Sequence, residues 1–430
     1  FEHLLSAIGW DVPEINVEVE AESKIEQAVY EALEMEKEVD IIVRLKGQAD
    51  FNQIYANTKR KGKSAKAKEV VTSLQQNAKA SQQGIEKAIL SLEKNGKAKK
   101  KDSLWIINGI TLTVSKEGLE ELKNHKEVER ITLDKEVQLP EITTEQSKPR
   151  LPEWGLEKIF APKVWGDYGL KGEGIVVGIM DTGVDGNHEA LRHNYRGKDG
   201  NHQYSWIDLS GNNYAAPTDG HGHGTHVART AVGGGEGEPI GVAPEAEWIA
   251  AKIFNDGGST TLSAIHQAFE WFMAPGGDPS RAPHVVNNSW GNANTYNTEF
   301  YEDVQAWVAA GIFPLFSAGN EGPGSQTVGS PGSFPESFAI GATDVNDQIA
   351  SFSSRGPVYW TDEDGNQQRI IKPDVSAPGH QIYSAWPSVR GAGKYHTISG
   401  TSMAAPHVSG AIALIYQANP KLTIEEVKDI

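Results

Sequence analysis

The chain has 430 residues and no cysteine, so it holds no disulfide, no thiolate nucleophile and no cysteine-ligated metal. Its 40 Lys and Arg residues against 57 Asp and Glu residues give a net charge of −17, which argues against nucleic acid or an anionic membrane as the main partner. No apolar run approaches the ~18 residues of a membrane span, so we expect none. From the length of the chain we expect two or three domains.

The composition changes near residue 150. Residues 1–150 hold 24 basic and 26 acidic residues with 7 Gly, whereas residues 151–430 hold 16 basic and 31 acidic residues with 38 Gly. The two parts are therefore predicted to be separate domains, joined by the polar, proline-containing stretch 139–152. The chain begins with Phe1 and stops in a helical pattern without a cap, so we expect an excerpt of a longer protein.

The first part alternates strand and helix patterns. Residues 1–37 are acidic and mostly helical, and are expected to form an N-terminal extension. The elements predicted after it are a strand at 39–46, helix to about residue 92, a strand–turn–strand at 104–115, a helix at 117–126 and a strand at 127–138. The order β-α-β-β-α-β predicts an α+β, ferredoxin-like domain over residues 38–138.

A basic run, KRKGKSAKAK at 59–68, interrupts the long helical stretch of this domain. Such a run can bind nucleic acid, but the negative net charge favours a solvated helix face or loop instead. The amino-acid sequence alone indicates no function for the surrounding insertion, residues 58–80.

In the second part, apolar strands alternate with helical patterns. Near-continuous apolar strands separated by helices predict an α/β fold of three layers, with a mostly parallel sheet covered on both faces. Chemistry in such folds lies at the carboxyl ends of the strands, where Asp181, Asn288 and Asn320 are placed. The predicted strands are 175–181, 247–254, 284–290, 313–320 and 338–344, with helices at 261–273 and 300–310.

Three residues could act together although each has a plain alternative. Asp181 ends a buried strand, where a carboxylate often caps a turn. His223 lies in a Gly-rich stretch with His221 and His226, which raises the alternative of a metal-dependent hydrolase, although the spacing matches no HExxH pair. Ser402 precedes an apolar helix, where serine is a common N-cap.

Taken together, Asp181, His223 and Ser402 fit nucleophilic catalysis. A serine hydroxyl needs an adjacent base, a neutral imidazole can accept its proton, and a buried carboxylate can fix the imidazole tautomer. The chain order Asp, His, Ser is the order found in subtilisin. Asn320 can donate its side-chain N–H to the developing oxyanion.

Four stretches resemble the signature blocks of the subtilisin-like serine proteases, or subtilases. They are MDTGVDGNH (180–188), HGTHVA (223–228), SAGNEG (317–322) and GTSMAAPHVSG (400–410), in the family's order over residues 153–430. The stretches WGLEKIFAPKVW and HNYRG further resemble the bacillopeptidase F type. The resemblance implies a subtilisin-like catalytic domain, with Asp181, His223 and Ser402 as the triad and Asn320 in the oxyanion hole.

The resemblance also implies a substrate cleft that binds polypeptides by backbone pairing. Its glycine floor would be Gly329, and Glu321 at the rim would favour a basic side chain. The segments implied to line the cleft are Ser289, Trp290 and Gly291, Gly257 and Gly258, and Ser317 with Gly319.

The first domain is similar to the inhibitor-type propeptide of subtilases, an intramolecular chaperone and inhibitor. Its C-terminal tail, about 133–140, would lie in the active-site cleft, and self-cleavage would fall within 138–152. Because parallel sheets fold slowly, a bound template would assist the catalytic domain. The resemblance thus implies a monomeric zymogen of a Gram-positive bacterium, secreted either into the medium or to the cell surface.

Two departures from the family pattern bear on function. Arg229 stands where the family usually has Gly, so it either displaces the helix that carries His223 or reaches solvent; the first case suggests a catalytically impaired binding or scaffold protein. The strong family calcium site is expected to be lost, because its loop (232–244) is short and Ala190 replaces a helper Asp. The turn at 361–366 offers weak calcium ligands at most, and the chemistry requires no cofactor.

Overall fold

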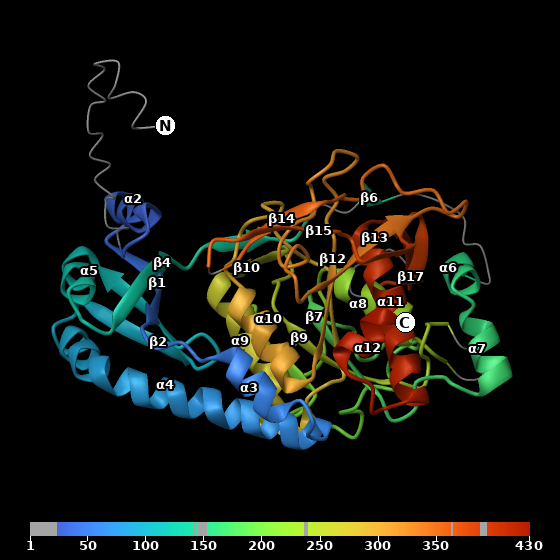
Figure 1. Cartoon of the computed structure of the whole chain (residues 1–430), viewed down its shortest axis with the longest axis horizontal. Coiled ribbons are helices and arrows are strands. Elements are labelled where there is room, and N and C mark those ends of the chain that lie inside the picture. The colour runs from blue at the N-terminus through green and yellow to red at the C-terminus, as the bar shows by residue number, and fades with distance from the viewer. Residues whose placement is uncertain (1–23, 141–142, 145–152, 236–239, 363, 388–393) are drawn as a thin grey trace, which may run out of the picture.

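The computed structural model describes residues 24–140, 143–144, 153–235, 240–362, 364–387 and 394–430. Figure 1 shows two regions, each built on its own sheet. We call residues 24–140 the N-terminal region and residues 153–430 the C-terminal region. Within the described residues, no helix has the length and apolar character needed to cross a membrane.

The N-terminal region has the predicted ferredoxin-like topology. Its sheet has the order β2-β3-β1-β4, and every neighbouring pair is antiparallel. The central strand β1 is apolar and buried at Ile41, Ile42 and Val43, which explains its position. The elements are α2 (Gln27–Met35), β1 (Glu38–Leu45), α3 (Phe51–Thr58), α4 (Lys63–Lys94), β2 (Ala98–Leu104), β3 (Gly109–Ser115), α5 (Lys116–Lys123) and β4 (Val128–Leu133).

Three boundaries predicted for this region need correction. The first strand of the 104–115 hairpin is the polar stretch Ala98–Leu104, whereas residues 105–108 form the turn. Ile106 and Ile107 are apolar because they pack against the C-terminal region. The described end of the 1–37 extension belongs to this fold, since Ile25 and Val29 are buried in its core.

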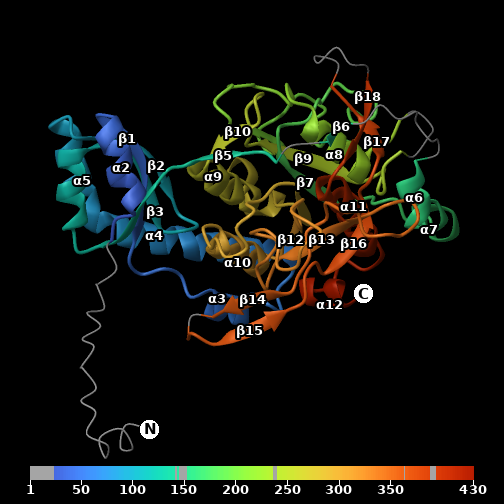
Figure 2. The same ribbon diagram turned by 90° about the horizontal axis from the view of Figure 1, so that it is seen from above.

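The predicted strand at 127–138 is two strands with different partners. β4 stays in the small sheet, while β5 (Glu136–Gln138) pairs antiparallel with β10 (Ser259–Thr261) of the C-terminal region. Further along, β6 (Thr143–Thr144) pairs with β18 (Tyr395–Ser399). Figure 2 shows the chain leaving the small sheet and running beside β10 toward β6. The described parts of the predicted linker therefore lie along the C-terminal region.

The C-terminal region has the predicted parallel sheet. Its seven strands have the order β16-β13-β12-β11-β7-β9-β8, with parallel pairing throughout. β8 and β16 were not predicted. The strands are β7 (Val176–Asp181), β8 (Trp206–Asp208), β9 (Glu247–Lys252), β11 (Val285–Asn288), β12 (Phe313–Ser317), β13 (Phe338–Thr343) and β16 (Val375–Pro378).

Helices bury both faces of this sheet. Along β7, Val177 and Ile179 belong to the apolar cluster of α8 (His223–Val232) and α11 (Thr401–Ala418). Val176 and Met180, on the other face, belong to the cluster of α9 (Leu262–Met273) and α10 (Tyr301–Ala310). This second cluster also contains side chains of the N-terminal region, so the two regions share one apolar core.

Candidate active site

The carboxyl end of β7 and the start of α8 bring two predicted site residues into contact. Asp181 is the last residue of β7, and His223 is the first of α8. His223 Nδ1 lies 2.7 Å from Asp181 Oδ1, and both side chains are buried. A proton on Nδ1, donated to the carboxylate, leaves Nε2 as the free base. The pair has the geometry of a base and its orienting acid.

Glycine and Asp219 explain why α8 begins at this place. A Cβ on residue 224 would lie 2.0 Å from the Gly183 carbonyl oxygen, so only glycine allows α8 to start against the turn after β7. The buried Asp219 carboxylate accepts hydrogen bonds from the backbone N–H groups of Gly222 and Thr225. Burial raises the pKa of Asp219. Asp219 was not among the predicted site residues, although an Asp before a Gly-rich turn often accepts hydrogen bonds from the backbone N–H groups of that turn.

Ser402 is the second residue of α11, and Ser289 holds it from both sides. The Ser402 hydroxyl donates to the Ser289 carbonyl oxygen (2.9 Å), and the Ser289 hydroxyl donates to the Ser402 carbonyl oxygen (2.8 Å). Within the part of the chain that the structure describes, no hydrogen bond joins Ser402 to His223. To act as nucleophile, Ser402 must exchange its carbonyl acceptor for the free nitrogen of His223.

Asn320 and the Ser402 backbone point toward one place. The Asn320 side-chain oxygen accepts hydrogen bonds from the Thr401 backbone N–H and hydroxyl, each at 2.9 Å, which leaves Nδ2 free to donate. Asn320 Nδ2 and Ser402 N lie 3.6 and 3.7 Å from the position that a Cβ on Gly400 would take. Two donors at one point beside a candidate nucleophile can stabilise an oxyanion.

A small pocket beside Ser402 contains most of the predicted substrate residues. A Cβ on Gly329 would lie 2.3 Å from the Asn292 carbonyl oxygen, so the wall there requires glycine. The space left in the pocket is about 20 Å³, because Pro140 of the N-terminal region lines it as well. Its other lining residues include Gly291, Ser317, Gly319, Asn320, Glu321, Gly329 and Ser402.

Comparisons with known proteins agree with this geometry. Residues 172–430 match the model of the subtilase family. The chain belongs to the subtilase family. It is 36% identical to Bacillopeptidase F of Bacillus subtilis over 95% of this chain and 30% of that protein. It is 33% identical to Subtilisin E of the same species over 86% of this chain and 85% of that protein, and 35% identical to Serine protease AprX over 61% of each. The predicted resemblance is confirmed, although this subtilase spans less than a third of Bacillopeptidase F.

The cleft of this subtilase is occupied by its own N-terminal region. The Leu139 N–H donates to the Gly258 carbonyl oxygen (2.8 Å), directly after the β5–β10 pairing. Gly258, which the resemblance placed in the cleft, therefore contacts the tail of the N-terminal region, and its φ of +86° favours glycine. Gly257 is instead an exposed turn residue whose N–H donates to Asn255.

Trp290 is a correction to the predicted cleft lining. Its side chain is buried and packs edge-to-face against Phe269, Phe300 and Phe316. The large aromatic ring thus stabilises the layer of α9 and α10, whereas the flanking Ser289 and Gly291 contact Ser402 and the pocket.

The three histidines of the metal alternative do not converge. His226 Nε2 lies 3.0 Å from the Ile382 carbonyl oxygen and 3.2 Å from that of His396, which identifies it as a donor. Burial lowers the pKa of His226 well below its ordinary value. Among the described residues, no group of three His, Asp or Glu side chains could hold a metal ion. The acidic turn at 361–366 connects β14 (Val358–Thr361) to β15 (Gln367–Ile370); its residue 363 lies outside the described residues.

Arg229 does not reach solvent, so that alternative was wrong. Its side chain is 2% exposed, and Nη1 donates to the Tyr383 carbonyl oxygen (2.8 Å). The buried carboxylate of Glu153 faces it: burial raises the pKa of Glu153 to about 7, and the positive charge of Arg229 opposes that rise. Burial in turn lowers the pKa of Arg229, against the charge of Glu153. Arg229 therefore has a counter-charge on the segment that opens the C-terminal region.

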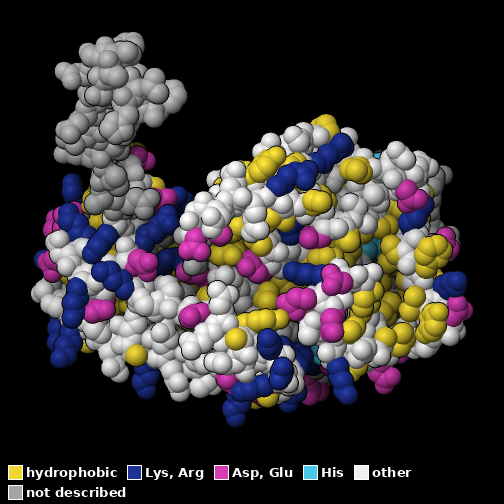
Figure 3. All heavy atoms as spheres, in the orientation of Figure 1, with side chains coloured by type: hydrophobic (Ala, Val, Ile, Leu, Met, Phe, Trp, Pro, Cys, Tyr) yellow, Lys and Arg dark blue, Asp and Glu magenta, His cyan; other side chains and the backbone are white. Residues whose placement is uncertain are grey.

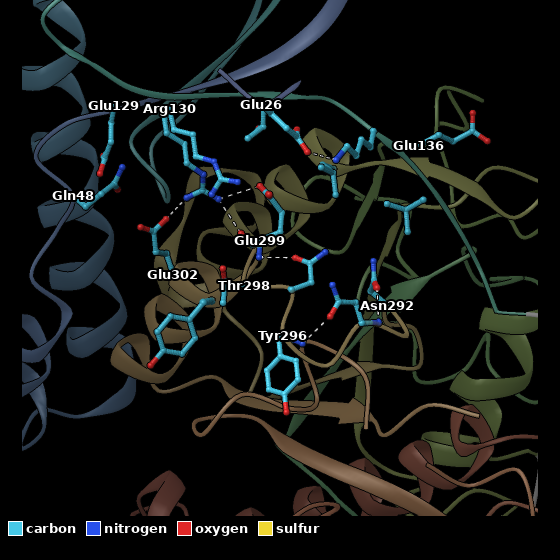
Figure 4. Close-up of a pocket in the computed structure, with 18 residues that line it drawn as sticks. Glu26, Gln48, Glu129, Arg130, Glu136, Asn292, Tyr296, Thr298, Glu299 and Glu302 are labelled. Carbon is cyan, nitrogen blue, oxygen red and sulfur yellow. Dashed lines mark hydrogen bonds and ion pairs between the residues drawn. The ribbon is translucent and has the colours of Figure 1, made fainter. Parts of the chain in front are cut away.

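A second group of charges, missed by sequence analysis, joins the two regions. Arg44 of β1 donates to the Glu299 and Glu302 carboxylates, and Glu299 also contacts His266, which is paired with Asp303 at 2.9 Å. Figure 4 shows Glu299 and Glu302 pointing into the pocket of about 540 Å³ between the regions. Burial alone would lower the pKa of His266, but the Asp303 and Glu299 carboxylates raise it to about 9. No local sequence pattern signals these long-range contacts.

Proposed function

We propose that this subtilase is a secreted serine endopeptidase precursor that cleaves its own chain between the N-terminal and C-terminal regions. One observation carries the proposal. β5 pairs with β10 as a bound peptide would, Leu139 continues along Gly258, and the next residue, Pro140, lines the pocket that contains Ser402 and Asn320. The names of the relatives, serine protease and subtilisin, support the same chemistry.

The reaction proceeds in two steps, acylation of Ser402 and hydrolysis of the acyl-enzyme. Ser402 Oγ attacks the Pro140 carbonyl carbon while His223 accepts the serine proton, and Asp181 stabilises the resulting imidazolium. The oxyanion receives hydrogen bonds from Asn320 Nδ2 and the Ser402 backbone N–H. His223 then gives its proton to the leaving nitrogen of Glu141 as the C–N bond breaks, and water hydrolyses the acyl-enzyme. The cleavage separates the N-terminal region covalently from the C-terminal region, as a propeptide whose tail had blocked the cleft.

Other properties follow by analogy with the relatives. Secretion and a Gram-positive source are proposed by analogy with the similar proteins reported above, which come from Bacillus subtilis. We further propose that the enzyme acts as a monomer on polypeptides and has no strong calcium site. Glu321 in the pocket is proposed to favour a basic residue before the cleaved bond.

Self-processing tests the proposal. Wild-type precursor is expected to yield two fragments whose boundary lies after Pro140, and the Ser402→Ala variant is expected to remain intact. Intact mass and N-terminal sequencing measure both results. If the two proteins stay uncut while folded, the endopeptidase proposal fails, and the alternative of an impaired binding or scaffold protein gains support. A cut elsewhere in 138–152 would refute only the assigned bond.

A further inference from the structure

The insertion at 58–80 lies on the C-terminal region, far from the cleft in sequence and in space. It belongs to the hairpin of α3 and α4, which Figure 1 shows running beneath the C-terminal region. α3 contacts α10, and α4 contacts both α10 and the short helix Pro279–Arg281. The subtilase chemistry described above uses none of these contacts.

The long helix α4 connects two cores. Its C-terminal half packs in the N-terminal region through Ile85, Ile89 and Leu92. Its N-terminal half, at Val70, Val71 and Leu74, belongs instead to the apolar cluster that contains Phe272 and Trp307 of the C-terminal region. A helix of 32 residues is about 48 Å long, so one continuous rod joins the two cores.

Polar contacts hold the N-terminal end of α4 against the C-terminal region. Lys63 Nζ donates to the Ala282 carbonyl oxygen (2.6 Å), and burial lowers the pKa of Lys63 to about 7. The Lys66 stem lies over Gly311, where a Cβ would be 3.3 Å from Lys66 Cδ. On α3, partial burial and the neighbouring Glu425 carboxylate raise the pKa of Tyr55. The hairpin thus contacts three separate elements of the C-terminal region.

The basic run of residues 59–68 is divided between two environments. Lys59, Arg60, Lys61 and Lys68 are exposed, as the interpretation of a solvated face predicts. Figure 3 shows Lys and Arg side chains along the lower edge of the molecule, where the hairpin lies. Lys63 and Lys66 are instead partly covered by the C-terminal region. The helix therefore presents two lysines to a partner and its other basic residues to solvent.

We propose that the face of the C-terminal region formed by α10, the helix Pro279–Arg281 and the start of the last helix, α12 (Ile424–Asp429), is a docking surface for the α3–α4 hairpin. This surface holds the N-terminal region after the linker is cut, even when the tail has left the cleft. The tail then governs access to the active site, and the hairpin governs how long the cut N-terminal region stays bound. The inference rests on the proposed role of the N-terminal region as a propeptide.

The test cuts the linker without using the enzyme's own activity. Full-length Ser402→Ala protein carries a recognition sequence for an outside protease between residues 145 and 150. After cutting and dilution, size-exclusion chromatography follows how fast the two fragments separate. Because Ser402 is absent, the result does not depend on whether the proposed endopeptidase is active.

Three variants distinguish the tail contact from the hairpin contact, and all of them keep the Arg44 and Ile107 contacts between the regions. Leu139→Pro removes the hydrogen bond to Gly258 and so weakens the contact of the tail with the cleft. Lys63→Glu/Lys66→Glu reverses the two covered charges, and Lys59→Glu/Lys68→Glu is the matched control with the same charge change at exposed positions. Removing a buried, charged hydrogen bond predicts fragment separation about 10- to 100-fold faster in the hairpin variant. The tail variant and the control are expected to separate as slowly as the parent.

Rapid separation of the tail variant would overturn the proposal, because the hairpin would then be insufficient to hold the fragment. Slow separation of the hairpin variant, or equal separation of the hairpin variant and its control, would overturn it as well. Hydrogen exchange of β1 and β3 in the uncut proteins checks that the N-terminal region remains folded in each variant.

Discussion

The seven-stranded sheet is covered on both faces by helices of its own region, whereas the four-stranded region completes its apolar packing against its neighbour. Val177 and Met180, on opposite faces of β7, both lie in C-terminal clusters. In the N-terminal region, Ile106 and Ile107 belong to an apolar cluster that also contains Phe272 and Trp307 of the C-terminal region. The α8 and α11 face of the large sheet is thus packed by C-terminal residues alone, whereas side chains of the N-terminal region complete the cluster on the α9 and α10 face.

Because the candidate catalytic residues all lie in the C-terminal region, changing one of them should slow self-cleavage without altering the fold of the N-terminal region. Asp181→Asn removes the charge that stabilises the His223 imidazolium and favours the wrong tautomer, so self-cleavage should slow about 10⁴-fold. The measurement is intact mass against time, with Asp185→Asn on the same turn as control. Hydrogen exchange of the N-terminal region should not change. A slowing of less than tenfold would contradict the assigned role of Asp181.

Arg229 tests how the start of the C-terminal region is held. Arg229→Met leaves the buried Glu153 without a counter-charge, which should lower the free energy of unfolding by about 3–5 kcal/mol. Because the pKa of Glu153 is raised to about 7, the loss should grow as the pH rises through 7 and the carboxylate ionises.

Denaturant unfolding of Ser402→Ala proteins at pH 5 and pH 8 measures this loss. Adding Glu153→Gln to Arg229→Met should restore most of the stability. If Arg229→Met instead leaves stability unchanged, and speeds self-cleavage when it is made in the protein that retains Ser402, Arg229 is an impairment of the site rather than a partner of Glu153.

A substitution at Asn320 tests whether this residue stabilises the oxyanion or positions the bound strand. Asn320→Ala removes one oxyanion donor and should slow self-cleavage about 10²–10³-fold, the loss known for the corresponding change in subtilisin itself. Asn346→Ala, in an exposed turn, is the control. The variant should leave the β5–β10 pairing intact, as measured by hydrogen exchange of residues 136–139. Loss of that protection would show that Asn320 positions the bound strand rather than the oxyanion.

The pH dependence of the free energy of unfolding tests the ion pair of His266 with Asp303 near the boundary between the two regions. Its pKa is raised to about 9 from an ordinary value of about 6.5, so its pairing with Asp303 stabilises the fold by about 3 kcal/mol below pH 6.5. This contribution should disappear as the pH rises from 6.5 through 9. His266→Gln should therefore flatten the fall of unfolding free energy over that range.

His284 provides the matched control for this experiment. Burial lowers the pKa of His284 to about 3, so it remains neutral throughout the range in which His266 loses its proton. His284→Gln should leave the slope of stability against pH unchanged between pH 6.5 and 9. Equal slopes in the two variants would contradict the pairing of His266 with Asp303.

The sequence determined the family, the ferredoxin-like topology, the parallel character of the large sheet and the residues at its strand ends, because these depend on local signals. It did not reveal β8, β16 or the strand order of the large sheet. Apolar runs such as β7 and β12 identify buried parallel strands, and Gly224 follows His223 because nothing larger fits there. Ferredoxin-like topology followed from element order alone, as the sheet order β2-β3-β1-β4 shows.

Tertiary structure decided what depends on partners distant in the chain. Trp290 was assigned to the cleft, yet aromatic neighbours from other helices bury it. Residues 105–107 were assigned to a strand because they are apolar, yet they lie in a turn, where Ile106 and Ile107 join the apolar cluster shared by the two regions. Burial of Arg229 opposite Glu153, and the placement of α4 across two cores, follow from packing between segments far apart in sequence. No local pattern encodes such contacts, because their energy arises only when both surfaces exclude water together.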